Sequence, residues 1–177
     1  MVDKETRKRW HVLADIIKNY GYKSVVEVGV FRGETCGYLL ESIKGHDFMI
    51  YAVDPYREYG GYAALDYEDI KSEAQLRAFV DPRCTHIEKF SVDAAEDFAD
   101  RSVDMVFIDA NHKYKWVTQD IATWWTKVRD GGVLSGHDYW SAKGGRNRGV
   151  RIAVNQFVSK NNLNLNRGDD GVWWVKK

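Results

Sequence analysis

Two aspartates of this 177-residue chain follow apolar segments, at points where neighbouring strands would end. Asp109 comes directly after Val103–Ile108, and Asp138 comes shortly after Val133–Ser135. If the two segments are adjacent strands of one sheet, these carboxylates lie about 5 Å apart. Carboxylates that close repel each other unless a proton or a cation lies between them. Because Mg²⁺ prefers oxygen ligands and retained waters, the pattern indicates a divalent cation such as Mg²⁺.

Two histidines accompany these acids. His137 immediately precedes Asp138, and since successive strand residues point to opposite faces, both bind one ion only if the strand has already ended. Imidazole also suits borderline ions better than Mg²⁺. His112 lies in the polar stretch 109–114, where a histidine can accept a proton near neutral pH. The candidate metal ligands are therefore Asp109, His137 and Asp138, and the candidate catalytic residues are Asp109, His112 and His137.

Simpler roles stay open for the same side chains. Without a metal, Asp109 would face a bound cofactor and Asp138 would cap or pair locally. His112 would then be either a loop histidine bonded to the backbone or, together with His137, one of the two credible bases.

The segment Ser24–Gly33 predicts where a ligand binds. Three of its first five residues are valines, which favour a strand, and Gly29 then allows a sharp turn. Gly33 permits a close approach just before the helix expected from Glu34. A strand, a glycine turn and a helix open a βαβ unit, which binds its ligand at the carboxyl end of the strand. Glu27 is an acid with a buried position in that strand.

The turn itself disfavours a diphosphate ligand. Phe31 replaces the middle glycine of a dinucleotide-binding loop, and no Gly-Lys-Ser/Thr follows as in a Walker loop. Glu27 supplies negative charge where a phosphate would need donors. Asp54 ends the next apolar segment, Phe48–Val53, where a carboxylate can accept from both hydroxyls of a ribose. These residues favour a nucleoside that carries a positive charge.

Apolar strands alternate with amphipathic helices along the whole chain, without internal repeats or a linker. A strand that is apolar on both faces is typical of a parallel sheet covered by helices on each side. The pattern predicts one α/β domain over residues 1–177, with a mainly parallel sheet and a final hairpin. The expected helices are Lys4–Asn19 (within an N-terminal segment 1–20), Glu34–Ser42, Glu68–Val80, Ala94–Ala99, Lys115–Val128 and Val150–Lys160, and the other expected strands are Thr85–Phe90, Leu163–Leu165 and Val172–Val175.

Four segments together resemble class I S-adenosylmethionine-dependent methyltransferases. They are Glu-Val-Gly-Val-Phe-Arg-Gly (27–33), Tyr-Ala-Val-Asp-Pro (51–55), Phe-Ile-Asp-Ala-Asn-His-Lys-Tyr (107–114) and Gly-Gly-Val-Leu-Ser-Gly-His-Asp-Tyr (131–139). The later two are similar to the small-molecule O-methyltransferase branch, some members of which are metal-dependent. The resemblance covers about residues 20–160. It implies a Rossmann-like, doubly wound sheet of about seven strands with helices on both faces and a reversed last strand.

The resemblance also implies a role for each matching residue. Glu27, Gly29 and Gly33 would line the methionine part of the cofactor, Asp54 would hold the ribose, and Asp109 would lie beside the transferred methyl group. The adenine would lie near Ser91, Val92 and Asp93. A plain tight turn remains the alternative for the two glycines, and a helix cap the alternative for Asp93.

Two further segments are candidates for contact with an acceptor. Pro55–Tyr67 is rich in tyrosine and glycine and is expected to be a lid or substrate loop. Its tyrosines, with Tyr139 and Trp140, suit a flat or sugar-like acceptor. Lys143–Arg151 holds four cations and would bind an acidic group of the acceptor, or else be a solvated surface loop.

Composition limits the partners. Lys plus Arg and Asp plus Glu both number 26, so there is no net charge to favour nucleic acid. No apolar run approaches the length of a membrane span, and the N-terminus lacks the apolar core of a signal peptide. We therefore expect a cytoplasmic protein that binds a small molecule, neither nucleic acid nor membrane, with homo-oligomerisation open.

The sequence thus predicts an enzyme that transfers the methyl group of S-adenosylmethionine to a hydroxyl of a small molecule, assisted by a divalent metal. Two other functions remain: a nicotinamide-dependent oxidoreductase on a similar fold, and a non-catalytic nucleoside-binding module. The missing middle glycine argues against the first. The acid and histidine loops after the later strands argue against the second.

Overall fold

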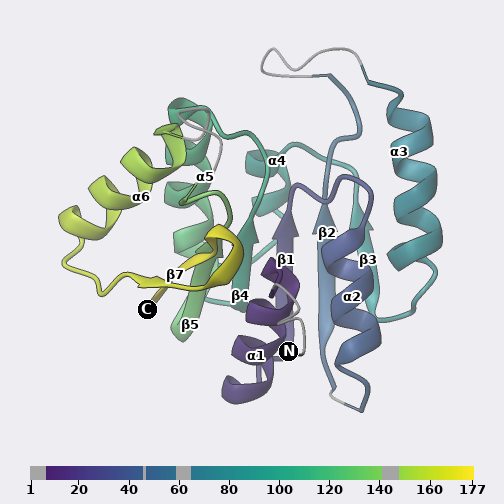
Figure 1. Ribbon diagram of the computed structural model, residues 1–177, viewed down its shortest axis with the longest axis horizontal. Coiled ribbons are helices and arrows are strands. Elements are labelled where there is room, and N and C mark those ends of the chain that lie inside the picture. Colours follow the sequence, from purple (N-terminus) through teal and green to yellow (C-terminus); the bar gives the residue numbers. More distant parts are fainter. Residues whose placement is uncertain (1–6, 46, 59–64, 141–147) are drawn as a thin grey trace, which may run out of the picture.

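A seven-stranded sheet covered by helices on both faces forms the protein (Figure 1). The computed structural model describes residues 7–45, 47–58, 65–140 and 148–177. Its strands lie in the order β3-β2-β1-β4-β5-β7-β6. They are β1 (Ser24–Val28), β2 (Met49–Val53), β3 (Cys84–Ile87), β4 (Val103–Ile108), β5 (Val128–Gly136), β6 (Asn166–Arg167) and β7 (Trp173–Lys176).

The first five strands are parallel, and the C-terminal pair reverses. β7 pairs antiparallel with β5, and β6 pairs antiparallel with β7. This confirms the predicted mainly parallel sheet with a C-terminal antiparallel hairpin. The chain proceeds from β1 outward to β3 and then returns to the other side of β1 as β4. The carboxyl ends of β1 and β4 therefore form the switch point at which open α/β sheets bind ligands.

The helices bury alternate residues of each strand. Val25 and Phe107 pack with the helices of one face, whereas Val26 and Val106 pack with those of the other. All six residues of β4 are buried, as expected of a central parallel strand. The first face carries α1 (Arg9–Tyr20), α2 (Glu34–Ser42) and α3 (Tyr67–Ala74) with the π-helical turn η1 (Gln75–Phe79), and the second carries α4 (Ser91–Ala95), α5 (Tyr114–Lys127) and α6 (Arg148–Lys160).

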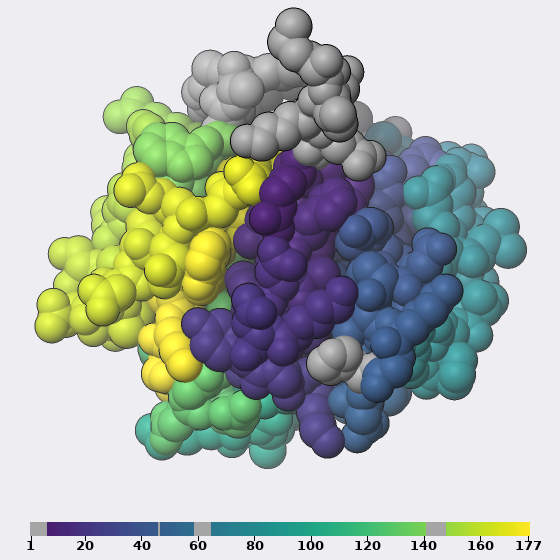
Figure 2. Space-filling model, turned by 60° about the horizontal axis from the view of Figure 1, so that its bottom comes forward, coloured from purple at the N-terminus to yellow at the C-terminus, as the bar shows by residue number. Residues whose placement is uncertain are grey.

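Helix α1 lies in the middle of the first face of the sheet. Figure 2 shows it between α2 and the C-terminal segment that holds β7 and the short 3-10 turn η2 (Asp169–Gly171). Gly21 ends α1 in the left-handed conformation, with φ of 64°. Because α1 packs against both neighbours, its first residue is brought to the switch-point edge of the sheet.

Most predicted elements differ from the observed ones only at their ends. The predicted strand Leu163–Leu165 is wrong, because these residues belong to no strand and β6 follows them as Asn166–Arg167. β1, α2 and β4 have the predicted bounds. The prediction that Asp93 caps a helix beginning at Ala94 is wrong, because α4 begins at Ser91 with Phe90 as its N-cap. Asp93 lies instead in the first turn, where a carboxylate interacts favourably with the helix dipole. Among the described residues, none of the helices is long and apolar enough to cross a membrane.

Candidate active site

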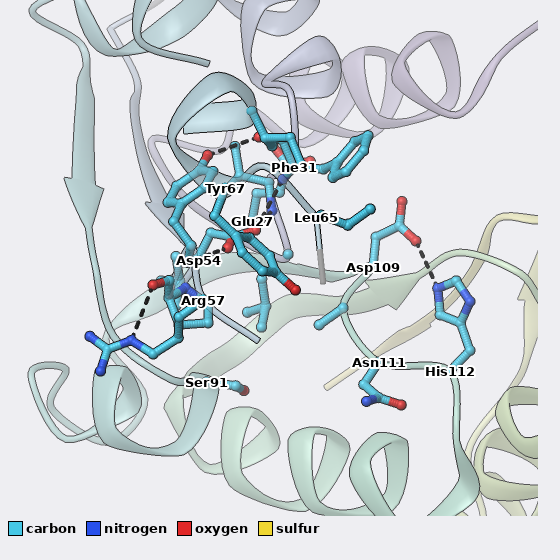
Figure 3. A pocket seen from close by; sticks show the side chains of 18 of the residues that line it. Glu27, Phe31, Asp54, Arg57, Leu65, Tyr67, Ser91, Asp109, Asn111 and His112 are labelled. Atoms are coloured by element: carbon cyan, nitrogen blue, oxygen red, sulfur yellow. Dashed lines mark hydrogen bonds and ion pairs between the residues drawn. The ribbon is translucent and has the colours of Figure 1, made fainter. Parts of the chain in front are cut away.

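A cavity of about 330 Å³ opens at the carboxyl ends of β1, β2 and β4 (Figure 3). Its lining includes an acid from each of these strand ends, namely Glu27, Asp54 and Asp109. Ser91 and His112 lie at different ends of the same cavity. The structure thus brings together acids that are 82 positions apart in the sequence, as a switch-point site requires.

The two glycines of the turn are required by the packing of the protein itself. Gly29 has φ of 88°, and a Cβ there would lie 2.5 Å from the Asp109 carbonyl oxygen. Gly33 has φ of 75°, and a Cβ there would lie 3.0 Å from Cα of Ala74. Gly29 lines the cavity, whereas Gly33 is outside the described lining and allows α2 to approach α3.

Asp54 organises the turn through backbone hydrogen bonds. Its Oδ2 accepts from the amide N–H groups of Val30 (2.9 Å) and Phe31 (3.0 Å), and its Oδ1 accepts from that of Tyr56 (2.9 Å). These bonds stabilise Phe31 in the left-handed region, with φ of 51°. A carboxylate accepts about four hydrogen bonds, so three backbone donors leave limited capacity for a ribose.

Glu27 is buried, with 3% of its surface exposed, as the sequence predicted. The Cys36 thiol donates a hydrogen bond to its Oε2 at 2.6 Å. Burial raises the pKa of Glu27 to about 8, and it outweighs the opposing effects of the Cys36 hydrogen bond and the Arg9 charge. The carboxyl group is therefore mostly protonated at neutral pH when the cavity holds no cation.

At the other end of the cavity, Ser91 belongs to a polar network that the sequence did not predict. Its hydroxyl accepts a hydrogen bond from Nε1 of Trp124 at 2.9 Å and also interacts with Asp120. Asp120 is buried beneath it, and that burial raises the pKa of Asp120 to about 6. Of the three residues expected near the adenine, Ser91 lines the cavity, whereas Val92 and Asp93 are outside its described lining.

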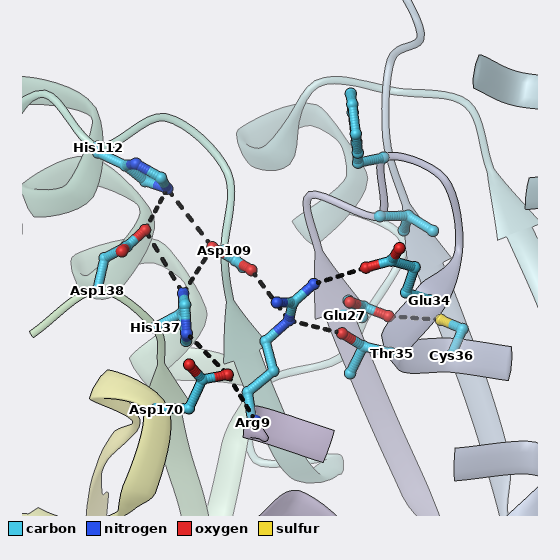
Figure 4. Close-up of polar contacts among 12 residues, drawn as sticks. Arg9, Glu27, Glu34, Thr35, Cys36, Asp109, His112, His137, Asp138 and Asp170 are labelled. Carbon is cyan, nitrogen blue, oxygen red and sulfur yellow. Dashed lines mark hydrogen bonds and ion pairs between the residues drawn. The ribbon is translucent and has the colours of Figure 1, made fainter. Parts of the chain in front are cut away.

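The predicted metal ligands come together beside the cavity (Figure 4). β4 and β5 are parallel neighbours with Ile108 paired to Gly136, so the residues that follow them lie side by side. β5 has ended before His137, and Asp138 adopts φ of 59°. His137 and Asp138 therefore face the same point, which a continuing strand would not allow. One donor atom each from Asp109, His137 and Asp138 lies within 4.8 Å of the others.

His112 completes this group from the loop after β4. Its Nε2 lies 3.1 Å from Oδ2 of Asp138 and 3.4 Å from Oδ1 of Asp109. Burial alone would lower the pKa values of His112 and His137, but the neighbouring carboxylates outweigh it and raise both. Among the described residues, the buried Nε2 atoms of both histidines lack a hydrogen bond of acceptable geometry. His137 faces the carboxylates of Asp138 and Asp109 with its other nitrogen, Nδ1, at 3.5 and 3.7 Å, and this mixed set of carboxylate and imidazole donors fits a divalent cation.

Arg9 is a site residue that the sequence analysis missed. It is the first residue of α1, and its side chain lines the cavity. Its Nε donates to Oγ1 of Thr35 at 3.0 Å and lies 3.6 Å from Oδ2 of Asp109. The periodicity of α1 indicated a helix, but it carried no signal that the first turn reaches the switch point.

A family model described as a methyltransferase domain matches residues 26–139, which include the strand-end acids and the histidine cluster. The chain belongs to this family. The match confirms the resemblance drawn from the four sequence segments and disfavours the nicotinamide-dependent oxidoreductase.

Individual relatives of this methyltransferase-family chain are distant. The uncharacterized protein R132 of Acanthamoeba polyphaga mimivirus is 24% identical over 160 residues, which are 85% of this chain and 66% of the viral protein, slightly less than two thirds of its length. The O-methyltransferase NovP has a similar structure, with a TM-score of 0.72 and 17% identity over 96% of this chain and 79% of NovP. An O-methyltransferase from Bacillus cereus, solved in complex with SAH, has a TM-score of 0.65 and 17% identity over 96% of this chain and 80% of the Bacillus protein. At these identities the structural likeness shows the fold alone.

Only parts of the two expected acceptor segments can be placed in the methyltransferase domain. Residues 59–64 of Pro55–Tyr67 and residues 141–147, which include Lys143, lie outside the described residues. Tyr56, Leu65 and Tyr67 line the cavity, and the Tyr56 hydroxyl donates to the Phe31 carbonyl oxygen. Tyr139 is buried and its hydroxyl donates to Asn155, so its ring is not an exposed stacking face.

Proposed function

We propose that this protein transfers the methyl group of S-adenosylmethionine to a hydroxyl of a small-molecule acceptor. The observation that carries this proposal is the continuity of the two halves of the site. Asp109 and His112 line the cavity and also belong to the cluster with His137 and Asp138. A cofactor in the cavity would therefore present its reactive end directly to groups that can orient and deprotonate a hydroxyl.

The chemistry of the cavity suits this cofactor. Asp109 supplies negative charge at one end, and Glu27 does so once a bound cation displaces its proton, where a sulfonium and an ammonium group need it. Ser91 and Asp54 lie toward the other end, where the nucleoside would bind. A structural neighbour of the same fold was solved in complex with SAH, the product that remains after methyl transfer.

The transfer forms a bond between the acceptor oxygen and the methyl carbon as the carbon–sulfur bond breaks. The protein contributes by holding the oxygen in line with that bond, which accounts for much of the rate in such reactions. We assign His112 as the group that takes the hydroxyl proton, because its Nε2 lies at the edge of the cavity within 3.4 Å of both carboxylates. Asp109 and Asp138 would stabilise the imidazolium that forms.

The cluster would also hold a divalent cation through Asp109, His137 and Asp138. When bound, such an ion lowers the pKa of a hydroxyl and orients it. The chain's own residues fix the geometry for either route, because the register of β4 and β5 sets the separation of the two carboxylates.

Binding and turnover measurements test the proposal. Isothermal titration calorimetry with S-adenosylmethionine, SAH and the nicotinamide dinucleotides should show binding of the first two alone. A panel of sugar and phenolic hydroxyl compounds, with SAH formation as the readout, should then reveal turnover. Cofactor binding without turnover across a broad panel would favour a non-catalytic binding module, and absence of S-adenosylmethionine binding would refute the proposal.

A further inference from the structure

A cavity that binds S-adenosylmethionine needs a positively charged side chain as well as its acids. The amino-acid end of S-adenosylmethionine carries an ammonium and a carboxylate, and the ionised carboxylates of Glu27 and Asp109 attract the first and repel the second. Among the described lining residues, the two arginines are Arg9 and Arg57. Figure 3 places Arg57 beside Asp54 and Ser91, toward the nucleoside end. Arg9 lies at the opposite end, between Asp109 and the start of α2.

The guanidinium of Arg9 is held in place but has donors to spare. Its Nε donates to Thr35, which is the guanidinium's one hydrogen bond to the described residues. The carboxylates of Glu34 and Asp109 each lie 3.6 Å away, beyond hydrogen-bond distance. A guanidinium has five N–H donors in a planar fork that matches a carboxylate. The partly exposed side chain therefore offers a prepared carboxylate site.

The start of α2 favours an anion at this position, and the start of α1 fixes the guanidinium there. Glu34 and Thr35 form the first turn of α2, whose N-terminal amide groups carry partial positive charge. The backbone N–H of Arg9 donates to Oδ2 of Asp170 at 3.0 Å, which fixes the start of α1 against the C-terminal segment. The position of the guanidinium thus follows from the packing of α1 between two neighbours, as Figure 2 shows.

We propose that Arg9 binds the carboxylate of the methionine part of the cofactor. This proposal rests on the proposed function, since it takes S-adenosylmethionine as the ligand. The ammonium then lies toward Glu27 and Asp109, so the two ends of the amino acid are distinguished by opposite charges of the protein. Arg9 would also keep the carboxylate away from the acidic cluster, because it stands between Asp109 and α2.

Decarboxylated S-adenosylmethionine provides a direct test, because it differs from the cofactor only in lacking this carboxylate. The dissociation constants of both ligands would be measured by calorimetry for the wild type and for Arg9→Gln. The wild type should bind S-adenosylmethionine about 10- to 100-fold more tightly than the decarboxylated compound, the range expected for hydrogen bonds to a charged group. In Arg9→Gln this preference should disappear, through weaker binding of S-adenosylmethionine and unchanged or tighter binding of the decarboxylated compound.

Two further variants separate the proposed role from a merely structural one. Arg7→Gln is the matched control, since Arg7 pairs with Asp15 and Asp169 outside the cavity lining and should keep the wild-type preference. Arg9→Lys should retain part of it, because an ammonium keeps the charge without the fork. Equal weakening of both ligands in Arg9→Gln, or no weakening of either, would overturn the proposal while leaving the cofactor assignment intact. Failure of the wild type to bind either ligand would refute both proposals.

Discussion

The Cys36 thiol donates a hydrogen bond of 2.6 Å to the buried carboxyl group of Glu27. Cys36 itself is fully buried, and burial raises the pKa of its thiol well above the usual value, so the sulfur keeps its proton as a donor. Arg9 and Asp109 influence Glu27 in opposite directions. The Glu27 carboxyl group is therefore mostly uncharged at neutral pH as long as no cation occupies the cavity.

We predict that Glu27 makes the free protein less stable as pH rises from about 5 to about 8. Its pKa is about 8 in the folded protein and 4.5 ordinarily, so the folded state binds the extra proton in that interval and loses stability as the proton is withdrawn. The loss should be about 1 kcal/mol per pH unit relative to Glu27→Gln, which does not titrate. Urea unfolding at pH 5, 6.5 and 8 measures it. Glu41→Gln, at an exposed position, should follow the wild type, and parallel curves for Glu27→Gln would contradict the prediction.

Gly29→Ala should destabilise the protein severely. A Cβ there would lie 2.5 Å from a backbone oxygen and 2.6 Å from Cα of Ala110, and neither atom belongs to a side chain that can move aside. Added to the cost of φ of 88°, this should lower the free energy of unfolding by about 3 kcal/mol or more. Gly45→Ala is the matched control, because Gly45 has a similar φ of 85° but open space around it, and it should cost about 1 kcal/mol. Equal losses in denaturant unfolding would show that the close approach to the loop after β4 is unimportant.

Asp54→Ala should weaken binding of S-adenosylmethionine by a few kcal/mol, on the order of one to two hydrogen bonds to a charged acceptor. The structure adds a second effect, since three backbone amides lose their acceptor and Phe31 loses the support for its left-handed conformation. We therefore expect a lower melting temperature even without cofactor. Calorimetry and thermal unfolding measure the two effects, with the exposed Asp47→Ala as control. Unchanged affinity would remove Asp54 from the cofactor site.

The sequence predicted the fold well because the fold depends on local patterns. Valine runs and fully apolar strands such as β4 indicate a sheet covered on both faces, and the reversal of β7 agrees with the hairpin expected at the C-terminus. Helix ends were less predictable. α4 begins three residues before the predicted start. The prediction missed this start because the N-cap, Phe90, makes no side-chain capping hydrogen bond that a sequence pattern could reveal.

The site could be predicted where it depends on strand ends, and not where it depends on distant packing. Asp109, His137 and Asp138 meet because β4 and β5 are neighbours and both strands have ended before these residues. Both requirements could be named from the sequence. Arg9 enters the site from one helix and Asp120 contacts Ser91 from another, and which residue of a helix reaches a site depends on how the helix packs. The glycine turn was identified correctly, but the contacts that require its glycines are with Asp109 and Ala74, both far along the chain.

Removal of divalent ions should abolish methyl transfer while leaving cofactor binding intact. The proposed ligands Asp109, His137 and Asp138 lie in or beside the cavity, but the residues proposed for the ribose and the adenine do not depend on them. Since His137 contributes an imidazole nitrogen, Mn²⁺, Co²⁺ or Zn²⁺ added after EDTA treatment should raise the melting temperature more than Mg²⁺ does. His137→Asn should reduce this difference. His11→Asn should leave it unchanged, because His11 is outside the cluster and its Nδ1 accepts from the backbone N–H of Lys8.

The chelator experiment also distinguishes the two routes for the acceptor proton. If activity is lost in EDTA and restored by an ion, the carboxylates act by holding that ion, and Asp138→Asn should be as damaging as chelation. If full activity persists in excess EDTA, the proton must pass to the chain itself, and His112 is the group whose Nε2 lies within 3.4 Å of both Asp109 and Asp138. His112→Asn should then lower kcat by about 10²- to 10⁴-fold with little change in cofactor affinity, because general-base catalysis contributes about that much. A variant with wild-type kcat under those conditions would exclude His112 as the base.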